Sequence, residues 1–233
     1  VKRLNLLSAE ESKVEKTKGP AGDQKKRLLS GFAASAAGLY LSIPDKNVVR
    51  AFDRETFKLK REYPLAGAGA LFAPDADGLL VATPAGLQRL NLADGKAAVL
   101  VAGDFSAATA ITANKKNIWV AFGEPTPQVR VFSAKGKPVR TIGNPEGCAR
   151  NGFYDPNDGF YNPSGLAVDS RGRLWVTEDN MRPKRTSVWK KGKWQRDFIG
   201  DTYYGGGGMI NPLDPTMAFY NGMRFKIDLD KGT

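Results

Sequence analysis

The chain has 233 residues, a formal net charge of +11 and a hydrophobic content of 41%, which is enough for a sizeable core. It contains one cysteine and no histidine, which excludes a disulfide within the chain, the usual zinc ligands and the serine–histidine and cysteine–histidine nucleophile systems. Any catalysis would therefore depend on carboxylates, lysine, tyrosine or a hard cation. No apolar run reaches the roughly 18–20 residues that a membrane-spanning helix requires.

Residues 1–29 are expected to be the end of a preceding structural unit or a linker. The segment VKRLNL at residues 1–6 resembles QRLNL at residues 88–92, which ends the third strand of a later repeat. Residues 8–27 are polar and rich in lysine, a composition that is typical of a solvated connection.

Four repeats of short apolar strands follow. Tyr40, Leu80 and Trp119 lie at equivalent positions of the first three repeats and are spaced by 40 and 39 residues, and Trp175 follows 56 residues later. A period near 40 that is built from short strands and turns is typical of a β-propeller with one four-stranded antiparallel blade per repeat. The sequence therefore predicts an all-β fold.

The predicted blades cover residues 31–64, 66–102, 105–143 and 161–201, and a partial blade covers residues 214–233. The turns between their third and fourth strands are rich in Gly, Asp and Lys, as tight hairpins require. Four full blades do not close a comfortable ring, so we expect six in the complete propeller, with the others lying outside this sequence or supplied by another chain.

Propeller blades stack face to face, so their inner strands are covered on both sides. We therefore expect the apolar residues of the second strands to be mostly buried: Leu39, Leu41, Leu80, Trp119, Val120, Leu174, Trp175 and Val176.

The segment NPSGLAVDSRGRLWVTE at residues 162–178 resembles the NHL repeat. The residues in register with that pattern are Pro163, Gly165, Ala167, Val168, Asp169, Gly172 and Trp175. The three earlier repeats share only its hydrophobic pattern. The sequence from residue 182 onward is similar to bacterial NHL-containing propeller proteins, and this resemblance implies an extracytoplasmic protein, either periplasmic or secreted.

Three long connections, residues 144–164, 179–186 and 201–215, are predicted to lie on one rim of the propeller. This rim, called the top here, carries the connections between second and third strands and those between blades. Long loops on a rigid scaffold commonly carry function. We therefore expect the three loops to form the largest concave surface and to supply the ligand or partner contacts: Arg150, Tyr154, Asp155, Glu178, Asp179, Arg182, Arg185, Tyr203 and Tyr204.

The predicted function is that of a binding or scaffolding module that engages a protein or carbohydrate partner at the top rim. The sequence assigns no catalytic residue, metal or cofactor. Asp155 to Gly159 resembles a calcium-binding loop, but its spacing is one residue short and no glutamate follows at the required distance.

Two other functions stay open. One is a propeller enzyme, such as a lyase or a lactonase-like enzyme, with carboxylates or a hard cation in a central top cavity. The lactonase-like NHL relatives use Glu, Asn and Asp ligands, a set that we do not find blade by blade here, and we favour a protein that is not an enzyme.

The other function is binding of nucleic acid or an anionic polymer through basic faces. Residues 180–196 hold seven basic residues, no acidic one, and Trp189 and Trp194, a composition typical of single-strand binders. The predicted strand divides this run, however, because Arg185 at the top and Lys191 at the opposite end are separated by roughly 20 Å. The two tryptophans are expected to pack between blades, and the divided run argues against nucleic acid.

The opposite end of the blades, called the bottom here, is predicted to be the more positive face. Its turns carry Arg54, Lys96, Lys115, Lys116, Lys135, Lys137, Arg171, Arg173, Lys190, Lys191 and Lys193. The top insertions instead hold Asp155, Asp158, Glu178, Asp179, Asp201 and Asp214 among their basic residues. We expect the bottom face either to bind an acidic partner or only to keep the protein soluble.

Overall fold

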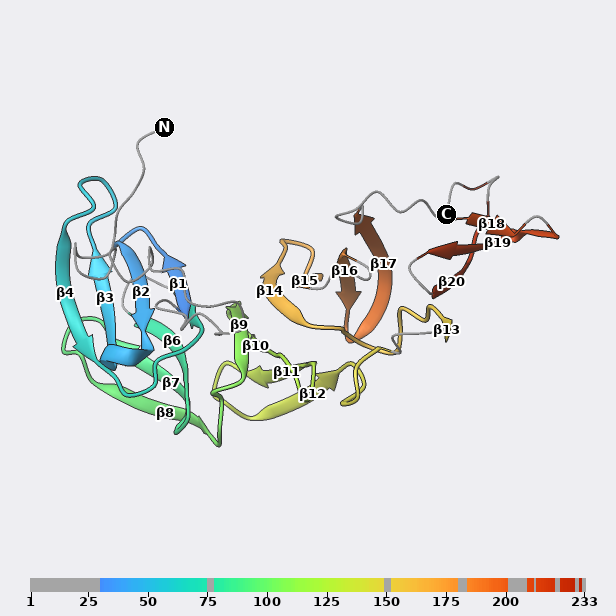
Figure 1. The fold of residues 1–233 in the computed structure, drawn as a ribbon. Coiled ribbons are helices and arrows are strands. Elements are labelled where there is room, and N and C mark those ends of the chain that lie inside the picture. The colour runs from blue at the N-terminus through green and yellow to red at the C-terminus, as the bar shows by residue number, and fades with distance from the viewer. Residues whose placement is uncertain are drawn as a thin grey trace, which may run out of the picture. The chain divides into compact units, whose positions relative to one another are not determined.

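The computed structural model describes residues 30–74, 78–148, 152–179, 184–200, 209–211, 213–220, 223–228 and 231. The expected end of a preceding blade at residues 1–29 lies outside the described residues. The chain divides into two compact units, Val1–Ser106 and Ala107–Thr233. In the described residues the strands form five four-stranded sheets (Figure 1), and no helix there is long and apolar enough to cross a membrane.

The first unit contains two blades whose strands pair in chain order, β1-β2-β3-β4 and β5-β6-β7-β8. The strands of the first blade are β1 (Gly31–Ala34), β2 (Leu39–Ile43), β3 (Val48–Phe52) and β4 (Leu59–Pro64). Those of the second are β5 (Leu71–Phe72), β6 (Gly78–Thr83), β7 (Gly86–Asn91) and β8 (Ala97–Ala102). A single 3₁₀ turn, Pro44–Lys46, connects β2 to β3.

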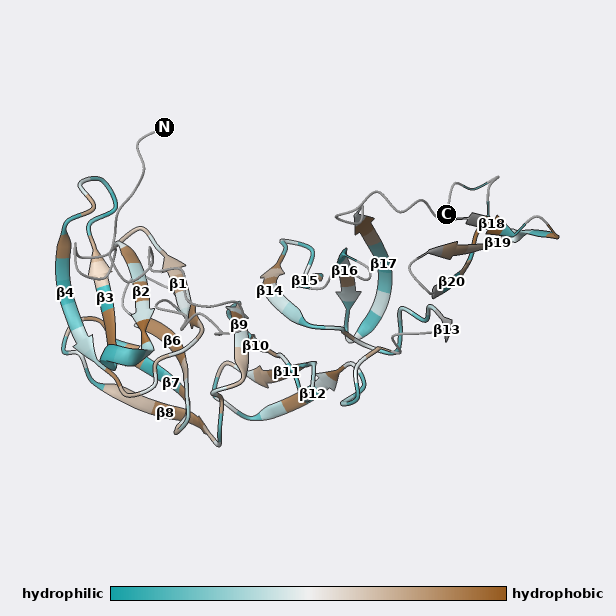
Figure 2. Ribbon diagram, in the orientation of Figure 1, coloured by the Kyte–Doolittle hydropathy of each residue, from teal (hydrophilic) through white to brown (hydrophobic). Residues whose placement is uncertain are grey.

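The core of the first unit lies between these two sheets. Tyr40 and Val49 of the first blade pack with Leu79, Val81 and Leu90 of the second, and all five side chains are buried. The central strands β3 and β6 are apolar over most of their length, whereas the outer strand β4 is largely hydrophilic (Figure 2). This gradient follows from burial, because inner strands are covered on both faces and outer strands face solvent.

The second unit begins with two similar blades, β9-β10-β11-β12 and β14-β15-β16-β17. The strands of the third blade are β9 (Ala108–Ala113), β10 (Asn117–Phe122), β11 (Gln128–Ser133) and β12 (Pro138–Ile142). Those of the fourth are β14 (Pro163–Val168), β15 (Leu174–Glu178), β16 (Lys184–Lys190) and β17 (Lys193–Gly200). The two sheets share a core in which Trp119 and Val131 pack with Val176, Trp189 and Phe160.

The fifth sheet takes one strand from a distant part of the chain. Its order is β13-β20-β19-β18, with β18 (Met209–Asn211), β19 (Asp214–Tyr220) and β20 (Met223–Lys226) as an antiparallel series. β13 (Gly152–Phe153) comes from the insertion before β14 and pairs with β20 in parallel. The backbone N–H of Tyr154 then donates to the Arg224 carbonyl at 2.9 Å.

The expectation that the second strands are mostly buried is met, because six of the eight residues are buried and the other two, Leu39 and Trp175, are half-buried. Trp119 is only 9% exposed because side chains of the fourth blade cover it. Trp175 occupies the equivalent position of the fourth blade, but it is half-buried and stacks on the exposed ring of Phe198 at 5.7 Å between centroids. Trp175 is therefore mostly covered, as predicted, but an aromatic ring of its own sheet covers it in place of a neighbouring core.

Candidate functional site

The top of the fourth blade is organised around one buried arginine. Arg185, the second residue of β16, is 2% exposed, and Glu178, the last residue of β15, is 8% exposed. The two side chains form an ion pair in which Arg185 Nη2 and Nε lie 2.6 and 2.7 Å from Glu178 Oε1. The other carboxylate oxygen, Oε2, accepts the backbone N–H of Tyr161 at 2.7 Å. The ion pair therefore connects the ends of two strands to the segment that enters β14.

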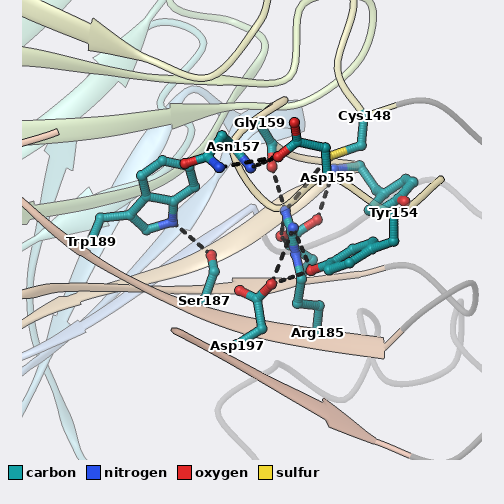
Figure 3. A network of polar contacts seen from close by, with 11 residues as sticks. Cys148, Tyr154, Asp155, Asn157, Gly159, Arg185, Ser187, Trp189 and Asp197 are labelled. Carbon is teal, nitrogen blue, oxygen red and sulfur yellow. Dashed lines mark hydrogen bonds and ion pairs between the residues drawn. The ribbon is translucent and has the colours of Figure 1, made fainter. Parts of the chain in front are cut away.

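The same guanidinium fixes the insertion that precedes the blade (Figure 3). Its Nη2 donates to the carbonyl oxygen of Gly159 and lies 3.8 Å from the Cys148 sulfur. Its Nη1 donates to the Tyr154 hydroxyl at 2.9 Å. The planar group stands over the rings of Tyr154 and Tyr161, with 5.7 and 5.5 Å from the Arg185 carbon to the ring centroids. An arginine can serve so many partners because its five N–H groups point outward in a fixed plane.

Asp197 of β17 is a second carboxylate in this network. Its Oδ2 lies 3.7 Å from Arg185 Nη1 and accepts the hydroxyl proton of Tyr154. Its Oδ1 is buried and has no hydrogen-bond partner among the described residues. Tyr154 thus connects the arginine to the outer strand, accepting from one and donating to the other.

Burial raises the pKa of the three neutral groups in this network, which are one thiol and two phenols. It raises the pKa of the Cys148 thiol to about 12, more than the nearby Arg185 lowers it. Burial also raises the pKa of both tyrosines, Tyr154 and Tyr161, far above the ordinary value for a phenol. These three groups keep their protons throughout the physiological range of pH.

Both members of the ion pair have a raised pKa, for different reasons. Burial raises the pKa of Glu178, although Arg185 and the Tyr161 N–H lower it. The pKa of Arg185 stays above its ordinary value, because Glu178 and its other partners outweigh the effect of burial, which lowers it. Arg185 is therefore a permanent cation in this site.

A hollow of about 460 Å³ lies beside the network and is open to solvent. The ends of β15, β16 and β17 line it with Thr177, Glu178, Asp179, Lys184, Arg185, Thr186, Phe198, Ile199 and Gly200. Asp179 and Lys184 at its border are exposed, and Phe198 and Ile199 are 47% and 43% exposed. The hollow thus combines an apolar wall with charged edges and hydroxyl groups.

The structure brings together three of the predicted site residues, Tyr154, Glu178 and Arg185, but it buries them in a network of mutual contacts. Asp179 lies at the border of the hollow. Asp155 is exposed on the insertion, where its Oδ1 accepts the N–H of Asn157 at 2.8 Å. The remaining predicted residues, Arg150, Arg182, Tyr203 and Tyr204, lie outside the described residues, as do most of the third long connection and part of the second.

The sequence interpretation missed Asp197 and the apolar wall of the hollow. Regular alternation from Trp194 would put Asp197 on the opposite face of the sheet. The register shifts between Val188 and Trp189 of β16, where Gln195 of β17 is left without a partner residue, and this places Asp197 beside Ser187 on the face of Arg185. Phe198 and Ile199 are exposed near the end of β17. The sequence predicted this strand but did not assign these two side chains to the site. No local pattern marks the register shift in advance.

Asp155 and Asn157 form an Asx-type turn in the insertion. Asp155, which resembled a calcium ligand, accepts from both the backbone and the side chain of Asn157. Within the described ranges, no group of three or more His, Cys, Asp or Glu side chains is arranged to hold a metal ion. The expectation that the protein uses no metal or cofactor stays a prediction.

Comparison with known proteins identifies the fold and no closer relationship. The chain resembles hydrazine synthase of Kuenenia stuttgartiensis with a TM-score of 0.55 and 15% identity over 78% of this chain and 53% of that one. It resembles virginiamycin B lyase of Staphylococcus aureus with a TM-score of 0.52 and 17% identity over 77% and 58%. A structure of a nidogen/laminin complex gives a TM-score of 0.57 and 12% identity over 75% and 66%.

The chain thus spans between about half and two thirds of the length of these solved chains. No protein-family model matches it, and no curated protein matches it.

Proposed function

We propose a function from the site, because the fold does not decide it: these comparisons find a β-propeller of four-stranded blades both in a lyase and in a complex between proteins. At identities of 12–17%, the comparisons show the fold alone. The choice between a binding module and an enzyme must therefore come from the site.

We propose that the chain is a binding module of the NHL-like, extracytoplasmic kind, and that the top of its fourth blade takes an extended segment of a protein partner. The observation that carries this proposal is the open hollow beside a buried ion-pair network. Phe198 and Ile199 offer exposed apolar surface, and Asp179 and Lys184 offer charges of both signs at its border. An apolar anchor with a polar rim is the composition of protein interfaces.

The network supplies rigidity to this surface. Arg185 and Glu178 form part of the lining and are fixed by contacts to the insertion, so the hollow does not depend on free side chains for its shape. A preorganised surface loses less entropy on binding than a mobile one, and this increases affinity. The described part of the long insertion therefore acts as a support for the site.

The test is selection of peptides from a random displayed library on the full chain, followed by affinity measurement with synthetic peptides. Ile199→Ala and Phe198→Ala should each weaken binding of the selected peptides by about tenfold or more, as for residues at the centre of an interface. Val139→Ala on β12 is the matched control, because Val139 is 44% exposed and lies on the outer strand of the third blade. The affinity of Val139→Ala for the selected peptides should equal that of the parent chain.

Selection that yields no peptide, or peptides that bind Ile199→Ala, Phe198→Ala and the parent chain equally, would contradict the proposal. Binding of an oligosaccharide in a parallel array, lost in Phe198→Ala and without any selected peptide, would instead assign the hollow to a carbohydrate. That result would also overturn the choice of a protein partner.

A further inference from the structure

The hairpin turns at the bottom of the third and fourth blades carry a dense set of exposed basic side chains. The turns are residues 114–116 and 134–137 in the third blade, and residues 170–172 and 190–193 in the fourth. We call these four turns, with the adjoining Arg140, the basic face. Its exposed basic residues are Lys115, Lys116, Lys135, Lys137, Arg140, Arg171, Lys190, Lys191 and Lys193.

Hydrogen bonds connect three of the four turns, directly or through Arg140. Within the third blade, the N–H of Ala134 donates to the Lys116 carbonyl at 2.8 Å. Between the blades, Nη1 of Arg140 donates to the Lys191 carbonyl at 2.5 Å. Because both contacts use backbone atoms of the turns, the lysine side chains remain available to solvent.

The turn between β16 and β17 has a constrained backbone conformation. Lys191 and Gly192 form the two-residue connection of β16 and β17 with φ values of 54° and 81°. Positive φ at both central residues is the conformation of a tight type I′ hairpin. A lysine rarely adopts it, so the backbone from which the Lys191 side chain projects has a constrained conformation.

Carboxylates do not neutralise the basic face. Among the described residues of the third and fourth blades, the one acidic side chain that adjoins the basic face is Asp169, which directly precedes the turn at residues 170–172. It already accepts from Arg173 Nε at 2.6 Å and from Trp175 Nε1 at 3.0 Å. The Trp175 hydrogen bond is the first cause that lowers the pKa of Asp169. The other acidic residues of these blades and their insertion lie toward the top: Glu124, Glu146, Asp155, Asp158, Glu178, Asp179 and Asp197.

From this one-sided distribution we infer that the basic face is a docking surface for an anionic lipid bilayer. The turns of two neighbouring blades spread the charge in two dimensions, which suits a planar partner. A single-stranded polymer is bound instead by a charged groove with interleaved aromatic rings, and none of the residues of these four turns is aromatic. Most of the charges are lysines, which act as hydrated point charges and need no bidentate geometry.

The expected strength follows from the number of charges. Each lysine or arginine close to an anionic bilayer strengthens binding by about fivefold, and the effect falls off within a Debye length of about 8–10 Å at physiological salt. Several such residues acting together give measurable but strongly salt-dependent binding.

The experiment is co-sedimentation of the full chain with vesicles of phosphatidylcholine that contain about one third phosphatidylglycerol, compared with vesicles of phosphatidylcholine alone. We expect binding to the anionic vesicles only, with a steep loss as ionic strength rises from about 0.05 to about 0.5 M. The double variant Lys135→Glu with Lys191→Glu, one change in each blade, should weaken binding on the order of 25-fold or more.

The matched control is Lys46→Glu with Lys226→Glu, which changes the net charge equally but lies outside the basic face, at the β2–β3 connection and at the end of β20. Thermal melts of all proteins establish that they are folded. The proposal is overturned if neutral vesicles bind equally well, if anionic vesicles fail to bind at low salt, or if the control pair weakens binding as much as the test pair.

A competition experiment with a soluble polyanion distinguishes a lipid bilayer from a linear polymer, since both are negatively charged. Heparin is added as a free competitor at equal charge concentration. If the chain binds heparin and does not sediment with anionic vesicles, the basic face recognises a linear polymer and the lipid assignment is wrong. Sedimentation with vesicles that heparin only partly reverses supports the bilayer.

Discussion

The tops of the second and fourth blades both connect a second strand to a third, but they do so with different chemistry. In the second blade the connection is short, and the Thr83 hydroxyl donates to the Gly86 carbonyl at 2.9 Å and accepts from Gln88 Nε2 at 2.8 Å. In the fourth blade the connection is long, and buried Glu178 and Arg185, at the strand ends that flank it, pair with each other and contact the insertion before the blade. A tight turn needs only neutral hydrogen bonds, whereas several converging segments require a group that can donate to many acceptors.

The largest expected effect is the loss of the arginine. Arg185→Met should lower the free energy of unfolding by about 3–5 kcal/mol, because it leaves Glu178 buried without a cation. Denaturant-induced unfolding measures this value. Lys184→Met, at the neighbouring exposed position, should change stability by about 0.5 kcal/mol or less.

A double variant sharpens this result. Arg185→Met with Glu178→Leu removes both charges and should be more stable than Arg185→Met alone, since replacing a buried ion pair by apolar groups is often neutral. If the double variant is as unstable as the single one, the cost arises from lost packing and not from the unpaired carboxylate.

The corresponding change in the second blade should be smaller. Gln88→Leu removes one neutral hydrogen bond and leaves the Thr83 hydroxyl its bond to Gly86, so the expected loss is about 1 kcal/mol. Gln195→Leu on the exposed strand β17 provides the control. If Gln88→Leu lowers the free energy of unfolding as much as Arg185→Met does, the tops of the second and fourth blades do not differ in this way.

The effect on stability that is smallest near neutral pH concerns the thiol beside the arginine. Because burial raises the pKa of Cys148 from 9.0 to about 12, the folded chain should react slowly with iodoacetamide at pH 8 and rapidly once unfolded by urea. Between pH 9 and 12 the unfolded thiol has lost its proton and the folded thiol has kept it. Its contribution to stability is therefore fully present below pH 9 and is lost as pH rises through about 12.

Mass spectrometry of the alkylated protein measures the reaction, and Cys148→Ala serves as the reference for stability. The variant should lose stability less steeply than the parent chain above pH 9. Equal slopes, or rapid alkylation of the folded chain, would show that the thiol is not shielded.

Much of the fold could be predicted from the sequence, because apolar strand runs and turn residues act locally. The predicted tight turns at Gly95, Gly136 and Gly192 all have positive φ, as a hairpin requires. The apolar runs around Leu80 and Trp119 indicated central strands for the same reason, since strands covered on both faces need apolar side chains in succession.

The candidate site was predicted only in part, because its geometry depends on distant pairing. The composition of the long connections identified Glu178, Arg185 and Tyr154, but could not show that they pair with one another and are buried. Asp197 joins them because the pairing of β16 with β17 shifts in register, which no pattern within β17 shows. The exposure of Trp175 likewise depends on what covers the sheet and not on the segment that carries it.

The parallel pairing of β13 with β20 has a consequence for how the chain is made. About 70 residues separate the two strands, so at roughly 5–20 residues per second a ribosome takes several seconds to deliver the second after the first. During that interval the edge of β13 has no partner strand, while the blade that follows it is already complete in sequence. Fusing a stalling sequence after the fourth blade and measuring protease sensitivity at the insertion should therefore reveal an intermediate that matures only when β20 emerges.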